Sequence, residues 1–151
     1  MIQVESESVG KDGTKIVYVP KENLLEFMKE KKEEGFDMLL MVTGVDYRDH
    51  LEVVYHLLST STGNRIVVKT KTEGEVDSVT SLWKGADWHE RETWDLVGIK
   101  FRGHPNLKRI LLAEGWVGHP LRKDYPMDKK QYVNLAEDGE DTVSFDPSEG
   151  Y

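Results

Sequence analysis

The first part of the chain alternates between apolar and polar positions in short blocks that predict strands and a helix. Residues 15–19 read Lys-Ile-Val-Tyr-Val, and this strand ends at Pro20, because proline cannot donate a hydrogen bond to a neighbouring strand. The polar residues before it predict an edge strand or a frayed lead-in. A helix follows, with Asn23 and Glu26 as a capping box and Gly35 as its stop. Its buried stripe is predicted to hold Leu24, Leu25, Phe27 and Met28.

Three more strands are predicted after this helix. Residues 36–45 are apolar on both alternating faces, which is typical of a strand covered on both sides, so we place it centrally in the sheet. Residues 51–59 and 65–71 alternate as the two arms of a hairpin. His50 and His56 lie in a turn and on a strand without a second ligand at metal spacing, so structural roles are expected for both.

A second, longer helix is predicted from Asp77 or Ser78 to about Val97, with Gly98 at its end. One face of this helix is apolar at helical spacing. The members of that stripe are Val79, Leu82, Trp83, Ala86, Thr93, Trp94 and Val97.

Glu90 interrupts the apolar stripe of the second helix. A buried carboxylate without a partner costs several kcal/mol, roughly. We therefore expect Glu90 to be buried and paired with a base, with Arg109 and Arg122 as candidates because arginine forms bidentate pairs. On this hypothesis Glu90→Gln destabilises the fold or its docking.

The order of elements predicts an α+β fold, with a mainly antiparallel sheet of about four strands and two helices packed on it (β-α-β-β-β-α), spanning residues 1–97. Residues 98–126 lack regular periodicity and carry six bases against two acids, a local charge of +4. We interpret them as an irregular interface segment packed on the first domain. Residues 127–151 carry two bases against seven acids, so an acidic, extended or disordered tail is expected that orders on a partner.

The composition excludes several classes of function. The chain has no cysteine, which excludes disulfides, thiol nucleophiles and cysteine-ligated clusters within it. Its net charge of −8 argues against general affinity for nucleic acid. The longest apolar run, residues 38–42, is far below the roughly 20 residues of a membrane helix, and no secretory signal is visible. We expect a cytoplasmic protein that reaches a membrane only through partners.

Metal binding is the first candidate chemistry. His89-Glu90 resembles the opening of the zincin motif, but Thr93 stands where the second histidine is required. His104 and His119, with Asp124 as a third ligand, define an alternative, a freestanding metal-dependent hydrolase. Both histidines stand between glycine and proline, where the chain turns, and a histidine in that position also fixes a turn through backbone groups.

Acid–base, nucleophilic and nucleic-acid chemistry have weaker signals. Glu90, Glu92 and Asp95 are three carboxylates on one helix, but the spacing places them on different faces. No Gly-x-Ser-x-Gly elbow or glycine-rich phosphate loop occurs. Aromatic residues mix with bases in residues 98–126, as in single-strand binders, but the acidic tail would repel a phosphate backbone. The remaining interpretation is a packing surface, because Trp, Tyr and Arg anchor protein interfaces.

Several strings resemble one family. Residues 90–112 (ERETWDLVGIKFRGHPNLKRILL) and 116–126 (WVGHPLRKDYP) are similar to the signature and closing motif of the thirty-kilodalton subunit family of respiratory complex I. Upstream, residues 36–46 (FDMLLMVTGVD), 54–58 (VYHLL) and 78–83 (SVTSLW) fit the same family. The resemblance covers roughly residues 15–126, while the short N-terminus and the acidic tail depart from the family.

The resemblance implies a non-catalytic assembly subunit in the peripheral arm of a membrane-associated NADH:quinone oxidoreductase of the respiratory chain. The implied partners are a large hydrogenase-like subunit and a small iron–sulfur subunit, on the cytoplasmic side of the membrane. Iron–sulfur clusters, and FMN in a complex I, belong to partners, and this chain is expected to hold no cofactor, metal or catalytic residue. The equivalent subunit of a membrane-bound hydrogenase or sulfur-reducing complex is the alternative.

The residues that carry the family motif are also the expected subunit interface. They are Glu90, Arg91, Glu92, Asp95, Gly98, Phe101, Gly103, His104, Pro105, Arg109, Trp116, Gly118, His119, Pro120, Arg122, Lys123, Asp124, Tyr125 and Pro126.

Overall fold

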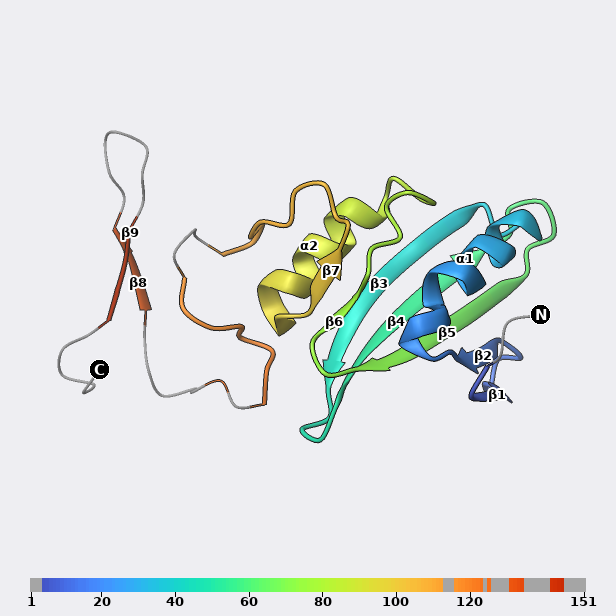
Figure 1. Cartoon of the computed structure of the whole chain (residues 1–151), viewed down its shortest axis with the longest axis horizontal. Coiled ribbons are helices and arrows are strands. Elements are labelled where there is room, and N and C mark those ends of the chain that lie inside the picture. The colour runs from blue at the N-terminus through green and yellow to red at the C-terminus, as the bar shows by residue number, and fades with distance from the viewer. Residues whose placement is uncertain (1–3, 113–115, 124, 126–130, 135–141, 146–151) are drawn as a thin grey trace.

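The computed structural model describes residues 4–112, 116–123, 125, 131–134 and 142–145 (Figure 1). Nine strands, two α-helices and one 3-10 helix are assigned in this part of the chain. The strands are β1 (Ser6–Val9), β2 (Lys15–Tyr18), β3 (Met38–Asp46), β4 (Leu51–Leu58), β5 (Arg65–Thr72), β6 (Glu75–Asp77), β7 (Lys100–Arg102), β8 (Gln131–Asn134) and β9 (Thr142–Phe145). The helices are η1 (Lys21–Asn23), α1 (Leu24–Glu33) and α2 (Ala86–Val97).

The main sheet has five strands in the order β1-β2-β5-β4-β3. All neighbours in it are antiparallel except β2 and β5, which are parallel because α1 and the β3–β4 hairpin lie between them in the sequence. The predicted α+β class is therefore confirmed, and β1 adds the fifth strand at an edge. Two further pairs are separate from this sheet, β6 with β7 in parallel and β8 with β9 antiparallel.

The position of β3 corrects the sequence prediction. It is the outermost strand of the sheet and not a central one. A β-bulge between Leu39 and Met41 shifts the register, so that Leu39 and Val42 are buried. Met38, Leu40 and Met41 remain 36% to 47% exposed. An edge strand with exposed apolar side chains has the same sequence pattern as a strand covered on both sides.

Helix α1 has the predicted stripe but not the predicted cap. Leu24, Phe27 and Met28 are buried, and Leu25 packs partly against them. The Asn23 side chain makes no capping hydrogen bond. The chain instead enters α1 through η1, where the Asn23 amide donates to the Pro20 carbonyl at 2.9 Å. The predicted capping box is therefore wrong, because Asn23, which is predicted to cap α1, belongs to the 3-10 turn.

Helix α2 begins at Ala86, later than the predicted start at Asp77 or Ser78. Glu75–Asp77 form β6 instead, and their pairing with β7 fixes an extended backbone where a helix start is predicted. Gly98 ends the helix in the left-handed region with φ 81°, as predicted.

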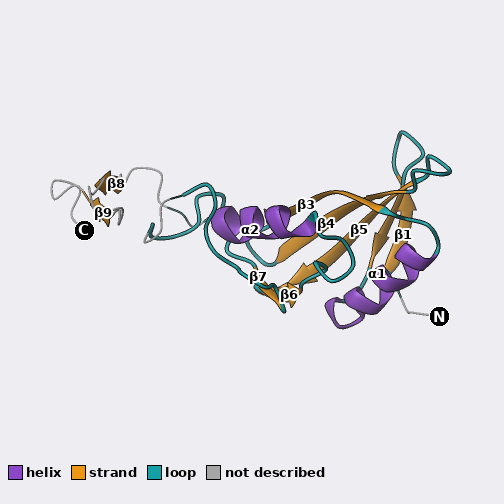
Figure 2. Cartoon of the chain, turned by 90° about the horizontal axis from the view of Figure 1, so that it is seen from above, coloured by secondary structure: helices purple, strands orange, loops and turns teal. Residues whose placement is uncertain are grey.

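The core lies between the sheet and the two helices. Val53, Tyr55 and Leu57 of β4 are fully buried on the face that the helices cover. Gly44 is the register partner of Val53, and a Cβ there would lie 2.8 Å from the Thr93 methyl of α2, so this helix approaches the sheet closely. Figure 2 shows α1 and α2 towards opposite ends of the sheet. This arrangement leaves the C-terminal end of α2 open to the segment that follows β7.

Candidate functional site

Glu90 is buried in the core, and no described residue gives it a basic partner. Its Oε1 accepts a hydrogen bond from Ser78 Oγ at 2.6 Å, and its Oε2 accepts one from the Val79 amide at 2.9 Å. Burial raises the pKa of Glu90 to about 7, against the lowering effect of these two bonds, and the nearby Asp87 charge raises it further. The predicted burial is confirmed. The predicted pairing with Arg109 or Arg122 is wrong, because both arginines bind elsewhere and Ser78, predicted as a helix cap, bonds to Glu90 instead.

Asp95 is the acid that organises the segment after β7. It is fully buried, and its Oδ1 accepts from Arg109 Nη1 at 2.7 Å. Its Oδ2 accepts from three consecutive backbone amides, residues 110–112, at 2.7 to 3.1 Å. Burial raises the pKa of Asp95, but the bonds from Arg109 and from these amides outweigh it, so that the pKa lies below its ordinary value.

Arg109 joins three parts of the chain through one guanidinium. Nη1 binds Asp95, and Nη2 donates to the carbonyls of Trp116 and Gly118 at 2.8 and 2.7 Å. Arg91 holds the same stretch from its other side, donating to the carbonyls of Lys108 and Arg109 at 3.1 and 3.2 Å. Fixed fork geometry allows arginine to make several such bonds at once.

The last carbonyls of α2 receive their partners from the following segment. Asp95 O accepts from His119 Nδ1 at 2.9 Å, and Leu96 O accepts from the Leu121 amide at 2.7 Å. Val97 O accepts from Arg122 Nε. A helix end has no intrahelical donors for these groups, so the second Gly-His-Pro triplet and its neighbours complete the end of α2.

The first Gly-His-Pro triplet fixes a turn against the start of α2. His104 Nδ1 accepts from the Asn106 amide at 2.9 Å, which places the ring proton on Nε2. Nε2 lies 2.9 Å from Asp87 Oδ1 and 3.3 Å from Asp87 O. Both ring nitrogens are therefore engaged within the chain.

The position of Gly98 requires glycine, because the His119 ring lies close to its Cα. A Cβ there would lie 2.6 Å from the His119 ring, in addition to requiring φ 81°. The His119 ring also packs on Trp94 with a centroid distance of 4.9 Å. The second triplet thus rests directly on the helix stop.

We expect Gly98→Ala to lower the free energy of unfolding by about 2 kcal/mol, from the left-handed backbone and from displacement of His119. Gly103→Ala, with φ 82° and no atom within 4 Å of the new Cβ, should cost only the backbone part, about 1 kcal/mol. Gly85→Ala, with φ −63° and open space, should be neutral or slightly stabilising. Urea unfolding of the three variants measures the order, and equal effects at Gly98 and Gly103 would contradict the His119 contact.

The remaining residues of the predicted interface lie at the rim of this segment. Trp116 Nε1 donates to Tyr125 Oη at 3.2 Å, and the Lys123 amide donates to Asp46 Oδ2 at 2.9 Å. This amide, with that of Arg48, holds the pKa of Asp46 below its ordinary value against burial. Glu92, Pro105 and Lys123 are exposed, Pro120 is half-buried and Phe101 is buried. Asp124 and Pro126 lie outside the described residues.

Four large apolar side chains on α2 and the following segment face solvent, and none of them is among the individual residues predicted to form the interface. Each is 54% to 61% exposed. They are Trp88, Leu111, Val117 and Leu121. Three of them lie in a stretch without periodicity, where a sequence pattern cannot separate outward from inward positions. In the sequence, the feature that could have identified them is their apolar character, since the charged residues near them bond within the fold.

The metal-hydrolase alternative has no assembled site in the described part of the chain. Among those residues no group of three or more His, Asp or Glu side chains is placed to hold a metal ion. His104 and His119 each have a partner on α2, and Asp124 is not among the described residues. Glu90, Glu92 and Asp95 likewise share no partner within that part of the chain.

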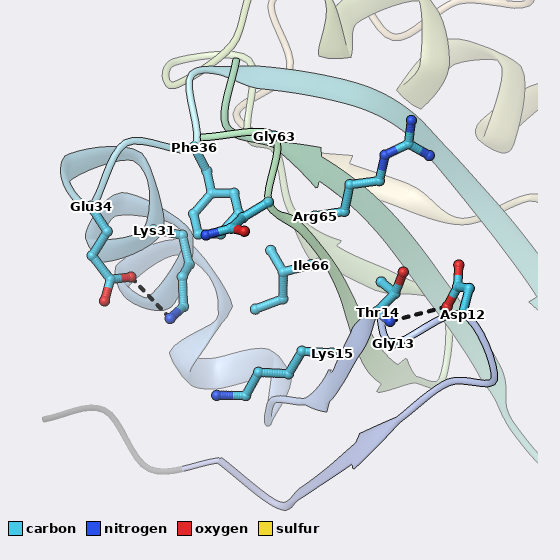
Figure 3. Close-up of a pocket in the computed structure, with 11 residues that line it drawn as sticks. Asp12, Gly13, Thr14, Lys15, Lys31, Glu34, Phe36, Gly63, Arg65 and Ile66 are labelled. Carbon is cyan, nitrogen blue, oxygen red and sulfur yellow. Dashed lines mark hydrogen bonds and ion pairs between the residues drawn. The ribbon is translucent and has the colours of Figure 1, made fainter. Parts of the chain in front are cut away.

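A separate hollow of about 670 Å³ lies at the C-terminal end of α1, between the β1–β2 turn and the β4–β5 loop (Figure 3). Phe36 and Ile66 line it together with three bases and two acids. Lys31 is paired with Glu34 at 2.9 Å, and Lys15 with Glu7 at 3.3 Å. Two of the three bases are therefore paired with acids, which reduces the positive charge that the hollow could offer an anion.

No helix among the described residues is long and apolar enough to cross a membrane. The site as a whole is a set of buried charged groups that fasten one segment to α2, with apolar side chains pointing outward. Such an arrangement fixes the shape of a surface.

The chain resembles known proteins in sequence and in fold. A family profile described as "Respiratory-chain NADH dehydrogenase, 30 Kd subunit" matches residues 17–131. An NADH-quinone oxidoreductase subunit of Citrifermentans bemidjiense is 47% identical over 130 residues, which cover 80% of this chain and 81% of that protein.

Solved structures share the fold as well. The trypsin-resistant fragment of Nqo5 is 32% identical with a TM-score of 0.63, covering 68% of this chain and 89% of that one. A chain of the membrane-bound sulfane sulfur reductase, an archaeal respiratory membrane complex, is 25% identical with a TM-score of 0.73, covering 82% and 78%.

The matches in sequence and fold place the chain among small α+β subunits of electron-transfer complexes. The chain belongs to the family of the 30 kDa subunit of respiratory-chain NADH dehydrogenase. It is a subunit of a multi-subunit, membrane-associated oxidoreductase complex, as the resemblance implied.

Proposed function

We propose that this chain is a non-catalytic assembly subunit in the peripheral arm of an NADH:quinone oxidoreductase. The proposal rests on the observation that the charged motif residues bond to other parts of this chain. Asp95, Arg109 and Arg122 bind α2 and its following segment to each other. Large apolar side chains of the same segment are exposed beside its remaining bases. Ordered apolar surface beside buried charge suits attachment to other subunits.

The proposed partners are a large hydrogenase-like subunit and a small iron–sulfur subunit, on the cytoplasmic side of the membrane. Family resemblance supports both partners. The exposed side chains Leu111, Val117 and Leu121 support contact through residues 98–126, since large apolar groups gathered on one segment mark interaction sites. The acidic tail, whose described residues pair as β8 and β9, is proposed to pack against the same partners, and most of it lies outside the described residues.

Cofactors are proposed to reside on those partners, as iron–sulfur clusters and FMN, and not on this chain. The absence of cysteine from the sequence supports this, because cluster ligation relies on thiolates. Engagement of His104 and His119 within the fold supports it further.

Purification of the chain alone and within its native complex tests the proposal. The complex should contain the chain together with both partner subunits and should oxidise NADH with a quinone. The isolated chain should contain no stoichiometric flavin, iron or zinc by absorption and elemental analysis. A metal bound tightly to the isolated chain, or a native complex that lacks the chain, would overturn it.

A second candidate is the equivalent subunit of a sulfur-reducing membrane complex. The specific observation is the fold match to the sulfane sulfur reductase chain, with a TM-score of 0.73 over 82% of this chain. Identification of the co-purified subunits decides between the two candidates, because only the first requires an NADH-binding flavoprotein.

A further inference from the structure

The outer edge of β3 is an unused row of backbone hydrogen-bonding groups. Among the described strands, β3 pairs with β4 alone. The Tyr47 amide donates to the His50 carbonyl at 2.9 Å across the turn, which sets the alternation along the pair. Thr43 and Val45 therefore exchange bonds with β4, while the N–H and C=O groups of Val42 and Gly44 point away from it.

No other backbone segment among the described residues pairs with these outward groups. The nearest attachment is at the end of the strand, where the Asp46 side chain accepts from the Lys123 amide. Exposed edge groups of this kind are a template for another strand. The apolar side chains Met38, Leu40 and Met41, 36% to 47% exposed, lie along the same edge.

A groove of about 140 Å³ runs between this edge and α2. Met41, Val42, Thr43 and Gly44 form one wall, and Leu96 and Glu92 of α2 belong to the other. Leu121, one of the exposed apolar residues, also lines it. One wall of the groove is thus formed by four consecutive residues of an edge strand. Figure 1 shows α2 beside β3.

We propose that an extended segment of a neighbouring subunit of the complex adds to the free edge of β3 as a sixth strand. The backbone groups of Val42 and Gly44 bind its main chain, and Met41, Leu96 and Leu121 take its apolar side chains. This inference rests on the proposed function, because it requires that the chain sit in a complex, and it adds where and how one partner is held.

The charge of the groove wall indicates which kind of partner segment binds there. Glu92 is exposed in the groove wall and has no ion pair in the described part of the chain. The incoming strand therefore carries a base opposite Glu92 between apolar positions. A second copy of this chain is a poorer occupant, because two-fold pairing of β3 with β3 would bring a second Glu92 into the same groove.

Amide hydrogen exchange at single-residue resolution tests the backbone part of the inference. In the isolated chain the Val42 and Gly44 amides should exchange quickly and the Thr43 amide slowly. In the purified complex Val42 and Gly44 should slow at least tenfold, with Thr43 unchanged. Unchanged exchange at Val42 and Gly44 in a complex that retains the chain would overturn the inference and leave the proposed function standing.

Substitution tests the side-chain part. Met41→Asp should lower the retention of the chain in the complex at least tenfold, with Leu121→Asp as a second variant in a loop should the first fail to fold. Val9→Asp, at an exposed apolar position on the opposite edge strand β1, is the control and should be retained like the parent chain. Equal retention of all variants would overturn the inference, whereas failure of the parent chain to enter any complex would overturn the proposed function.

A photo-crosslinking residue at Met41 identifies the occupant in the same complex. Crosslinks to an extended segment of a partner subunit are expected. Crosslinks to a second copy of this chain, or to its own residues 127–151, would overturn the assignment of the partner.

Discussion

Asp95→Ala is expected to lower the free energy of unfolding by about 3 to 5 kcal/mol. The substitution removes the acceptor of Arg109 and of three backbone amides and leaves a partly buried guanidinium without its carboxylate. Unsatisfied donors of this kind lose their full solvation. Chemical unfolding of the purified chain measures the change.

Glu92→Ala is the matched control for Asp95→Ala, because Glu92 lies on the same helix, is exposed and has no ion pair within the described residues. Its effect should stay within about 0.5 kcal/mol. A loss at Asp95 no larger than at Glu92 would show that the network does not stabilise the fold. The pKa of Asp95 is lowered in the folded chain, so its contribution is present above the unfolded pKa of about 3.9 and is lost as pH falls through the folded value.

The stability of the chain is expected to fall by about 3 kcal/mol as pH rises from about 4.5 to 7, through Glu90 alone. The pKa of this acid is raised from 4.5 to about 7 in the folded state. Within that window the folded chain holds a proton that the unfolded chain has released, so each rise in pH favours unfolding. Well above this window both states are ionised and the loss is complete.

Glu90→Gln should abolish this slope, because glutamine is uncharged. Its side-chain oxygen can accept from the Val79 amide, and its NH2 group can donate to Ser78 Oγ. The variant should be more stable than the parent chain above the window, which reverses the expectation drawn from sequence. Free energies of unfolding from acid to neutral pH for both chains measure the difference. The variant serves as the reference because the pKa of His50 is also raised, through its hydrogen bond to Glu52, and adds a slope of the same sign. Parallel profiles would contradict the assignment.

Much of the fold could be predicted from periodicity. Strands at 15–19, 51–59 and 65–71 appear within a few residues of their predicted bounds, because one buried face imposes alternation on each. The central position predicted for β3 is wrong because its exposed side chains are as apolar as its buried ones. The early start predicted for α2 is wrong for a different reason: Val79 and Trp83 are buried from turns, and helical spacing of apolar residues does not by itself require a helix.

The residues of the candidate site could be predicted from the sequence, but which of them bond to each other could not. Glu90 and Asp95 are both buried acids on one helix, and position in the stripe identified only Glu90. Which of them meets Arg109 depends on the path of the chain after β7, which has no periodic pattern to read. Three backbone amides bond to Asp95 because the chain turns there. Every residue except proline has such an amide, so the sequence does not reveal which ones bind an acid. The subunit interface itself stays a prediction.

The completion of α2 by residues 119–122 also bears on the order in which the chain matures. Translation delivers α2 well before the residues that bond to the carbonyls of Asp95, Leu96 and Val97. Until they emerge, the last turn of the helix frays into water, and Leu121 cannot take its place in the groove wall. A nascent chain is therefore unable to present its finished docking surface early. Capture by other subunits through this surface is therefore expected to follow the synthesis of residues 119–122.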